Sequence, residues 1–571
     1  MRHILTYLKP YRVRIAIGLS IKMLGTLAEL LLPVLLTAIL NEAIGALDIG
    51  RVILLGSLMI GCAAVACAGN IIANRMAART SMEFSRAVRR ELFHKTLYLS
   101  AHDADAFTVP SLESRITTDT YNVHNFVSMV QRMGVRAPIL FVGGMAISFA
   151  LDAHLALVML VTLPFIFVIV LTISRKSVPM YRQVQTSVDR MVRVVREDAM
   201  GIRVIKALSK NEFENRRYDG TNRALCADER RAGTVTGIIN PVMTLLMNLG
   251  ITAVIAVSAV RVAEDSSSAA TVIAFVQYFT LISNAMLALS RMFVMYTRSS
   301  ASARRISEVL LTPEGRSIEQ RSTPDAQAYV AMSHVTFSYL GKQPDVSDVT
   351  FALPRGGTLG VIGATGSGKT TLVRLLLRMY DADEGCVTLG GRAIHTYTRD
   401  ELSAMFGVAQ QNDFLYADTI EENIRFGRDL THEQVEWAAK VAQAHDFILA
   451  TEGGYEHQLT PKGTNLSGGQ KQRLLIARAI AARPQILILD DSSSALDYKT
   501  DAALRRALTE QMADSTVITV AQRVSSVKHC DVILVLDRGR VIGRGRHEEL
   551  LVSCPEYREI ADSQMGGAFV E

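Results

Sequence analysis

The chain has 571 residues, more than a single hydrophobic core usually serves, so at least two domains are expected. Charged residues make up 20% of the chain and the net charge is +6, which is modest for this length. The basic residues are not gathered into one tail, which argues against a nucleic-acid partner. Six cysteines lie scattered without a CxxC pair, which argues against a disulfide framework or structural zinc and predicts free thiols in a reducing compartment.

The N-terminal stretch "MRHILTYLKPYRVRIAIG" is basic and is followed by apolar residues. It is not interpreted as a signal peptide, because no small-residue cleavage site follows and because Lys22 and Glu29 interrupt the apolar run. The stretch predicts a short interfacial helix that leads into a first membrane span.

Residues 1–310 contain six segments that are apolar enough to cross a bilayer, for which about 20 residues are needed. Six buried helices of a soluble protein would be the alternative, and this density of apolar residues disfavours it. The predicted spans are 15–40, 52–74, 137–151, 154–174, 236–260 and 268–292.

The distribution of Lys and Arg predicts the orientation of these spans. Eight lie between residues 77 and 136 and fourteen between 175 and 235, whereas the opposite connections carry only Arg51 and Arg261. Because cytoplasmic loops carry the excess of basic residues, we expect a multi-pass protein of the cytoplasmic (inner) membrane with both termini cytoplasmic. The two long basic segments are predicted to be helices that extend far into the cytoplasm.

Lys22 and Glu29 lie seven residues apart in the first span, two helical turns along one face. Charges at such depth are costly and usually face a bundle interior or a cavity. They could form a substrate-path or gating pair or a purely structural pair, or Lys22 could reach the inner interface. The sequence leaves these alternatives open.

The second half is predicted to be an α/β domain at 329–562, after a polar linker at 311–328 and before a tail at 563–571. In it, "TLGVIGATGSGKTTLVRLLLRMY" predicts a strand, a glycine-rich turn and a helix that match GxxxxGK[ST]. Backbone N–H groups of such a loop wrap phosphate, its Lys reaches the β and γ phosphates, and its Thr hydroxyl binds Mg²⁺. The predicted ATP-binding residues here are Gly363, Ala364, Thr365, Gly366, Ser367, Gly368, Lys369, Thr370 and Thr371.

A second strand, "QILILDD", ends on two acids. Asp490 is placed to hold the Mg²⁺ shell together with Thr370. ATP and Mg²⁺ are therefore the expected cofactors of this domain.

The segment "NLSGGQKQRLLIARAI" carries the LSGGQ signature of ATP-binding cassette (ABC) proteins. With six spans ahead of it, the chain resembles a half-transporter of the type IV ABC exporters, in which a membrane domain is fused to a nucleotide-binding domain. The resemblance implies that each ATP lies between the phosphate loop of one chain and the signature of another, so the chain must dimerise. The implied signature contacts are Ser467, Gly468, Gly469 and Gln470.

The resemblance also assigns roles outside these motifs. Tyr339 of "VTFSY" stands where the family stacks a ring on adenine, and Gln411 where it senses the γ-phosphate, contacts Mg²⁺ and faces the membrane domain. The "SALD" loop at 494–497 is the one that crosses to the partner domain. Segments 111–119 and 201–214 resemble the two cytoplasmic tips that dock on the nucleotide-binding domains.

Two residues depart from the family pattern at the positions nearest the chemistry. Asp491 stands where a glutamate polarises the attacking water, and Gln522 stands where the family has histidine. Aspartate is shorter by one methylene, and misplacement of about 1 Å can cost about 100-fold in rate; glutamine cannot carry imidazolium charge. A weaker departure is Pro461, at a position that is often glutamate. Whether Asp491 still acts after a small backbone adjustment is left open.

With LSGGQ intact, the pattern resembles the degenerate-site subunit of heterodimeric bacterial multidrug-type exporters. It implies an ATP-driven exporter in which this chain's own phosphate-loop site hydrolyses slowly, with Asp491, Gln522 and Gln411 as its catalytic positions, while its signature completes the partner's hydrolytic site. The expected partners are a second ABC half-transporter and the lipid bilayer. The alternatives are a homodimeric exporter with slow hydrolysis and an ATP-gated membrane regulator or channel; a soluble ABC ATPase acting on DNA conflicts with the spans.

The sequence does not determine the transported substrate. Residues of the last two spans offer side chains for a cavity, although ordinary helix packing explains each of them as well. Met-rich linings adapt to varied ligands, which favours a small lipophilic compound and leaves peptide-like, lipid or siderophore cargo open. These residues are Met243, Met247, Asn248, Tyr278 and Asn284.

Overall fold

A computed structural model describes residues 1–44, 48–263, 268–313, 328–339, 341, 343–410, 414–492 and 494–565. It divides into two compact units, Met1–Tyr98 with Phe107–Thr312, and Leu99–Ala106 with Pro313–Glu571. Most of the expected linker at 311–328 and most of the tail at 563–571 lie outside the described residues.

The described residues of the first unit form helices and contain no strand. Five helical stretches in the described part of the chain are long and apolar enough to cross a membrane: His3–Asn41, Ile49–Tyr98, Val109–Leu151, Asn211–Arg261 and Ala269–Leu311. The expected span at 154–174 lies at the start of α8, where Ala153–Ile169 forms a shorter apolar helix. The main helices of the first unit are α2 Arg12–Ala38, α3 Ile49–Tyr98, α5 Val109–Ser114, α6 Thr120–Met133, α7 Arg136–Leu151, α8 Ala153–Ala207, α9 Asn211–Gly237, α10 Ile239–Ala263 and α11 Ala269–Leu311.

A single aspartate ends one apolar helix and starts the next. Asp152 adopts an extended conformation between α7 and α8, and its carboxylate accepts from the N–H groups of His154 at 2.9 Å and Leu155 at 3.4 Å. Such an N-cap satisfies donors that the first helical turn leaves unpaired. Asp152 also accepts from Arg261 of α10 at 3.0 Å, which ties a third helix to this corner.

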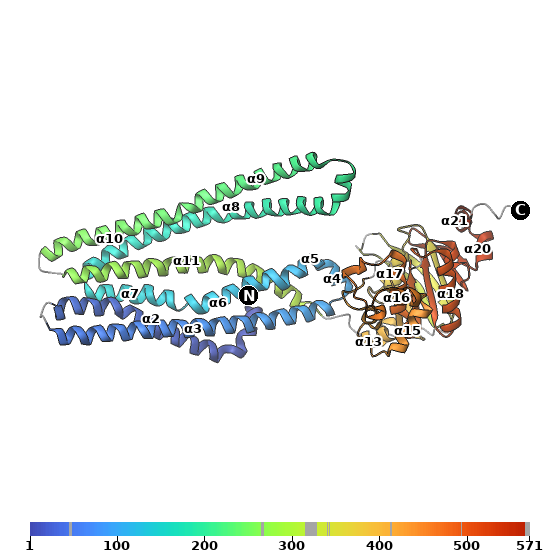
Figure 1. Ribbon diagram of the computed structural model, residues 1–571, viewed down its shortest axis with the longest axis horizontal. Helices are drawn as coiled ribbons and strands as arrows, with labels where there is room; N and C mark the ends of the chain where they lie inside the picture. The colour runs from blue at the N-terminus through green and yellow to red at the C-terminus, as the bar shows by residue number, and fades with distance from the viewer. Residues whose placement is uncertain are drawn as a thin grey trace. The chain divides into compact units, whose positions relative to one another are not determined.

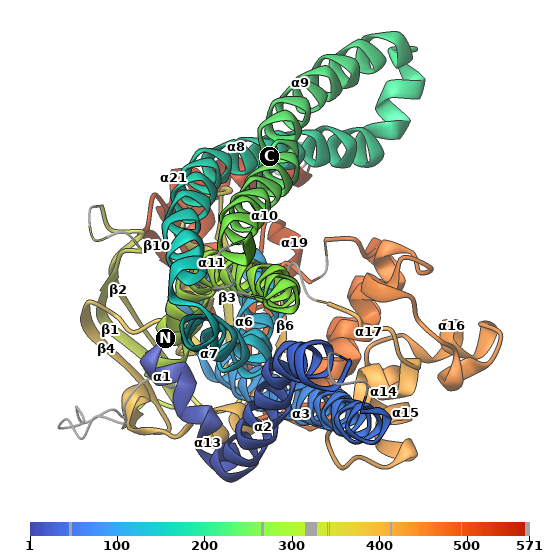
Figure 2. The same ribbon diagram turned by 90° about the vertical axis from the view of Figure 1, so that its left-hand side faces the viewer.

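Helices α8 and α9 form a long antiparallel hairpin whose far end lies away from the other helices of the unit in both views (Figures 1 and 2). Its turn is Leu208–Lys210, because α8 ends at Ala207 and α9 begins at Asn211. The segment 201–214, expected to be a docking tip, surrounds this turn; its docking stays a prediction.

The two charges of the first span do not pair with each other. Lys22 donates to Asn70 Oδ1 at 2.6 Å and to Asn74 Oδ1 at 3.1 Å, both on α3. Glu29 instead accepts two hydrogen bonds from Arg136 of α7, at 2.7 and 3.2 Å. Each costly charge is therefore satisfied by a different helix, as structural residues would be, and a gating role stays a prediction.

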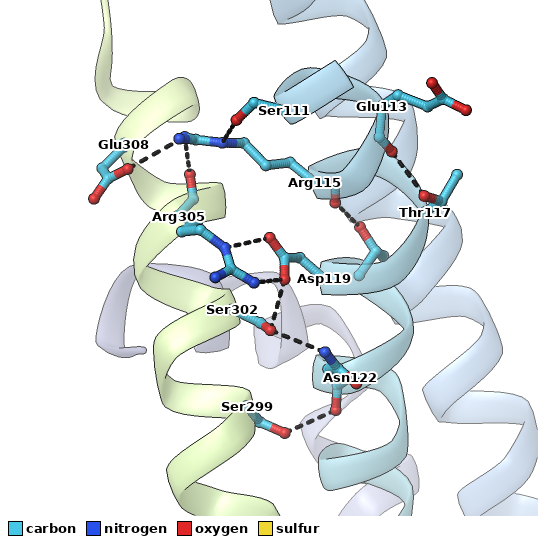
Figure 3. A network of polar contacts seen from close by, with 11 residues as sticks. Ser111, Glu113, Arg115, Thr117, Asp119, Asn122, Ser299, Ser302, Arg305 and Glu308 are labelled. Carbon is cyan, nitrogen blue, oxygen red and sulfur yellow. Dashed lines mark hydrogen bonds and ion pairs between the residues drawn. The ribbon is translucent and has the colours of Figure 1, made fainter. Parts of the chain in front are cut away.

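A buried polar network joins α6 to α11 (Figure 3). Asp119 ends a π-helical turn, Arg115–Asp119, and is fully buried. Its carboxylate accepts from Ser302 Oγ at 2.8 Å and from both Arg305 Nε, at 2.7 Å, and Arg305 Nη2. The Arg115 side chain also contacts α11: it donates to the Arg305 carbonyl at 2.6 Å and forms an ion pair with Glu308 at 3.2 Å.

Docking of the segment 111–119 on a nucleotide-binding domain stays a prediction. The segment's buried polar residues are used against α11 within the first unit. The residues that join the second unit are Leu99–Ala106, which include most of α4, Ala101–Phe107. There Asp105 accepts a hydrogen bond from the Tyr380 hydroxyl, and burial, followed by this bond, raises the pKa of Tyr380 to about 12.

The residues of the second unit that the structure describes form two sheets. One is antiparallel with the order β2-β1-β4-β5, and the other has the order β10-β9-β3-β8-β7-β6 and is parallel except for the β9–β10 pair. The near-continuous apolar runs of β3 and β7 are buried, as strands covered on both faces require. The strands are β1 Val330–Phe337, β2 Val346–Leu353, β3 Thr358–Gly363, β4 Glu384–Leu389, β5 Arg392–Ala393, β6 Phe406–Ala409, β7 Ile486–Asp490, β8 Thr516–Ala521, β9 Val532–Asp537 and β10 Arg540–Gly545.

Helices cover the parallel sheet and divide its apolar residues into separate clusters. The last helix, α21, runs to Met565, three residues past the expected domain boundary at 562. The helices are α12 Lys369–Leu376, α13 Arg399–Met405, α14 Ile420–Arg425, α15 His432–Val441, α16 His445–Ala450, α17 Gly468–Ile480, α18 Tyr498–Gln511, α19 Val524–Val527, α20 His547–Ser553 and α21 Pro555–Met565.

Replacing Asp119 by Ala is expected to destabilise the first unit by about 2–4 kcal/mol, because it removes a buried acceptor from Ser302 and Arg305. Thermal unfolding in detergent measures the effect as a lower Tm. Glu113→Gln, which changes an exposed carboxylate of the same segment that makes none of these contacts, is the control and should leave Tm unchanged. Equal Tm values for both variants would contradict the role given to Asp119.

Candidate functional site

The predicted phosphate loop connects the end of β3 to the start of α12. Gly363 is the last residue of β3, and Lys369 is the first residue of α12. Gly368, the N-cap of α12, has φ of +100°, and a Cβ there would lie 2.9 Å from the Asp345 carbonyl. Only glycine fits this left-handed position, so the loop can turn and present N–H groups at a helix N-terminus.

Two buried side chains lie in this loop, and neither has a hydrogen bond to an anionic group among the described residues. Lys369 is buried, and its ammonium donates to the Gly363 and Ala364 carbonyls, both at 2.8 Å. Burial lowers the pKa of Lys369, and the carboxylates of Asp491 and Asp490 oppose that shift. The Ser367 hydroxyl is buried and has no hydrogen-bond partner among the described residues.

Three neighbouring strands bring the predicted residues to one edge. In the parallel sheet, β8 lies between β3 and β7, so the carboxyl ends of all three strands meet. Gly363, Gln522 and Asp490 lie at or just beyond these ends, which is where ligands bind in open α/β sheets. Asp490 is buried, and burial raises its pKa; Asp491 adds to this shift and Lys369 opposes it.

These residues fit a phosphate group with its Mg²⁺ ion. An orphaned hydroxyl, a buried ammonium and a left-handed glycine turn are what a phosphate cradle needs. Thr370 is exposed beside the loop and Asp490 stands at the next strand but one. Mg²⁺ in such sites takes one hydroxyl, one carboxylate and phosphate oxygens and keeps several waters, so no larger cluster of protein ligands is required.

Asp491 and Gln522, the two residues that depart from the expected pattern, touch each other. Gln522 Nε2 donates to Asp491 Oδ2 at 3.2 Å. Asp491 has φ of +49°, a left-handed conformation that aspartate adopts more readily than most residues. Both line a pocket of about 690 Å³ together with Ser494, Tyr498 and Arg523.

The loop after Asp491 is tied to the signature helix. Gln472 of α17 accepts from the Ala495 N–H at 2.9 Å and donates to Ser494 Oγ at 3.2 Å and to the Asp491 carbonyl at 3.4 Å. The loop 494–497 is therefore held between the end of β7 and the start of α17.

The signature forms the N-terminus of α17. Ser467 is the N-cap, and it exchanges hydrogen bonds with Gln470, Gln470 N to Ser467 Oγ at 3.3 Å and Ser467 N to Gln470 Oε1 at 2.9 Å. Gly468, Gly469 and Gln470 form the first turn. In the described part of the chain, none of the hydrogen bonds of 467–470 reaches the phosphate loop.

Tyr339 lies beside α12, the helix that follows the phosphate loop. Its ring packs edge-on against Phe337 and Tyr380, with centroids 4.9 and 5.0 Å away. Its hydroxyl donates to Thr371 Oγ1 at 3.4 Å and accepts from Arg374 at 3.1 Å. Stacking on adenine stays a prediction.

The phosphate loop, Asp490, Asp491 and Gln522 lie at one edge of the sheet, whereas the signature residues 467–470 form the start of α17. Gln411 lies outside the described residues. The structure adds Gln472 and Gln564, which sequence reasoning missed. Gln472 lies four residues beyond the first signature glycine, so its place on that helix could have suggested it; Gln564 lies in the predicted tail, and no local signal pointed to it.

Comparison with known proteins defines the class. The family model of the ABC transporter transmembrane region matches residues 15–286, and that of the ABC transporter matches residues 346–494. A solved structure of a bacterial Atm1-family ABC exporter with ATP bound has the same fold, with a TM-score of 0.82, 22% identity and coverage of 98% of this chain and 99% of that one. The fold is that of an ABC exporter.

Relatives of similar length give the family. An uncharacterized ABC transporter ATP-binding protein of Mycobacterium bovis is 33% identical over 571 residues, covering 99% of this chain and 98% of its own. The uncharacterized ABC transporter ATP-binding protein YfiB of Bacillus subtilis is 33% identical over 569 residues, covering 99% of both. The chain belongs to the ABC transporter family and is a multi-pass membrane protein.

Gly368→Ala is expected to weaken ATP binding at least about tenfold, because the new methyl group meets the Asp345 carbonyl and φ of +100° is strained for alanine. Nucleotide titration of the purified full chain measures the loss. Gly341→Ala is a matched control, since Gly341 also has positive φ, +65°, but nothing within 4 Å of an added Cβ. Similar affinities in both variants would contradict the role of Gly368.

Proposed function

We propose that this chain is one subunit of a heterodimeric, ATP-driven exporter of the cytoplasmic membrane, with its nucleotide-binding domain and both termini cytoplasmic. The ABC membrane and ATP-binding regions in one chain support ATP-driven export. The distribution of Lys and Arg supports the orientation. ATP closes the two nucleotide-binding domains on each other, and this closure turns the spans outward.

The single observation that carries the unequal pairing is the contact between Asp491 and Gln522. A general base must come within about 2.6–3.2 Å of the proton it removes, and losing it costs about 10²- to 10⁴-fold. The Asp491 carboxylate is one methylene shorter than the glutamate of the family, and one of its oxygens accepts from the Gln522 amide. That amide has no titratable proton and adds no charge. The pair supports a site that holds ATP and hydrolyses it slowly.

The rest of the site supports nucleotide binding. Lys369 now donates to loop carbonyls and could donate to phosphate oxygens instead. The Ser367 hydroxyl has no partner among the described residues and could donate to the same phosphate. Thr370 and Asp490 would hold Mg²⁺, which would neutralise phosphate charge. A chain that had lost all nucleotide function would have no reason to keep these groups together.

The signature of this chain is complete and locally well formed. Ser467 caps α17 and frees the N–H groups of the next two glycines at a helix N-terminus, an arrangement that favours an anion. Gln472 holds the adjoining loop 494–497. We infer that this face completes the hydrolytic site of a partner subunit that carries the usual Glu and His.

The alternatives give different results in one experiment. The full chain is purified alone and with its partner, and ATP turnover and vesicle transport are measured. Slow turnover alone and fast turnover with the partner supports the heterodimer. Fast turnover by the chain alone that Asp491→Ala does not reduce would contradict it and favour a homodimer. Solute flux that needs ATP binding but not turnover would favour a regulator or channel.

Restoring the family residues provides a gain-of-function prediction. The chain alone, carrying Asp491→Glu with Gln522→His, is expected to hydrolyse ATP about 10- to 100-fold faster than the unmodified chain, because two copies would then pair two complete sites with two intact signatures. Steady-state phosphate release by the chain in lipid nanodiscs measures this.

The matched control makes the same chemical changes at two exposed positions outside the site, Asp514→Glu with Gln511→His. It should leave the rate unchanged. If the first double variant also leaves the rate unchanged, the two departures are not what limits hydrolysis, and the degenerate-site proposal fails.

A further inference from the structure

The segment that carries Gln522 lies beyond the support of the sheet. The pairing of β8 with β3 ends at Ala521, opposite Ile362, and its pairing with β7 ends one residue earlier, at Val520. Gln522 and Arg523 then cross to α19, which begins at Val524. The Gln522 carbonyl and the Val524 N–H therefore lie where neither a strand nor the first turn of a helix provides a partner.

The Gln564 side chain forms hydrogen bonds with both of these backbone groups. Gln564 Nε2 donates to the Gln522 carbonyl at 2.8 Å, and Gln564 Oε1 accepts from the Val524 N–H at 2.8 Å. The one side-chain amide thus hydrogen-bonds the backbone on both sides of Arg523, in the way that a peptide group of a neighbouring β-strand would. Arg523 itself points to the 494–497 loop, where it donates to the Ser494 carbonyl at 3.2 Å.

The helix that carries Gln564 is firmly anchored. Tyr557 and Ala561 of α21 are buried in a cluster that also holds Ile362, Ala521 and Val524. These residues precede the phosphate loop and flank the Gln522 segment. Gln564 follows Ala561 by three residues, so it lies on the same helical face, one turn closer to the site.

We propose that Gln564 is a positioning residue, which fixes the backbone around Gln522 and so sets where the Gln522 amide meets Asp491. The inference rests on the proposed function, in which this pair stands at the γ-phosphate end of the ATP site. The pocket beside the pair is lined by Gln564 as well as by Asp491 and Gln522. The C-terminal helix is thereby part of the nucleotide site.

The test replaces Gln564 by Met, which keeps the length of the side chain and loses both hydrogen bonds. Affinities for MgATP and MgADP are measured on the full chain in lipid nanodiscs. MgATP affinity is expected to fall roughly fivefold to tenfold with MgADP affinity unchanged, because Gln522 acts only at the γ-phosphate. Gln511→Met, on an exposed helix end, is the control.

A double-mutant cycle separates positioning from general stabilisation. In a Gln522→Ala background, the effect of Gln564→Met on MgATP should vanish, since nothing remains to be positioned. Equal losses for both nucleotides, additive effects, or no loss at all would overturn the inference and leave the proposed function standing. MgATP binding that Lys369→Ala does not weaken would overturn both.

Discussion

The register of three parallel strands governs the site of this protein. Because β8 lies between β3 and β7, residues that are far apart in sequence end at one edge of the sheet: the phosphate loop after Gly363, the acids at Asp490 and Asp491, and Gln522. Clusters of buried side chains hold the strands in this register. The same edge is where the signature helix and the C-terminal helix send Gln472 and Gln564.

The two residues that depart from the family pattern, Asp491 and Gln522, are in direct contact. A glutamate and a histidine at these positions would offer a longer carboxylate and a titratable ring. The aspartate and glutamine are joined by a hydrogen bond of 3.2 Å. The aspartate side chain is shorter than glutamate, and the glutamine amide, unlike histidine, cannot become charged. In the degenerate site proposed above, these two residues would hold nucleotide without the groups that rapid hydrolysis needs.

In the membrane unit, charged side chains are paired with polar or charged residues of neighbouring helices. Lys22, Glu29 and Asp119 are each bound by a residue of another helix, Asn70, Arg136 and Arg305 respectively. Buried charges without partners would be costly, so these contacts also specify which helices pack together. The network around Asp119 lies in the segment 111–119 and contacts α11 of the same unit.

The sequence by itself determined the features that are local. Apolar runs, the phosphate loop, the LSGGQ signature and the two departures from the family pattern are all readable within a few residues, and they identified the fold class and the family. The tertiary structure alone decided the contacts across long separations. The family resemblance placed Asp491 and Gln522 in one site, but only the structure shows that they touch across 31 residues. No periodicity or motif links Gln522 to Gln564, which lies 42 residues away. The partners of Lys22 and Glu29 were likewise hidden, because a helical pattern shows which face a charge occupies but not which helix packs against that face.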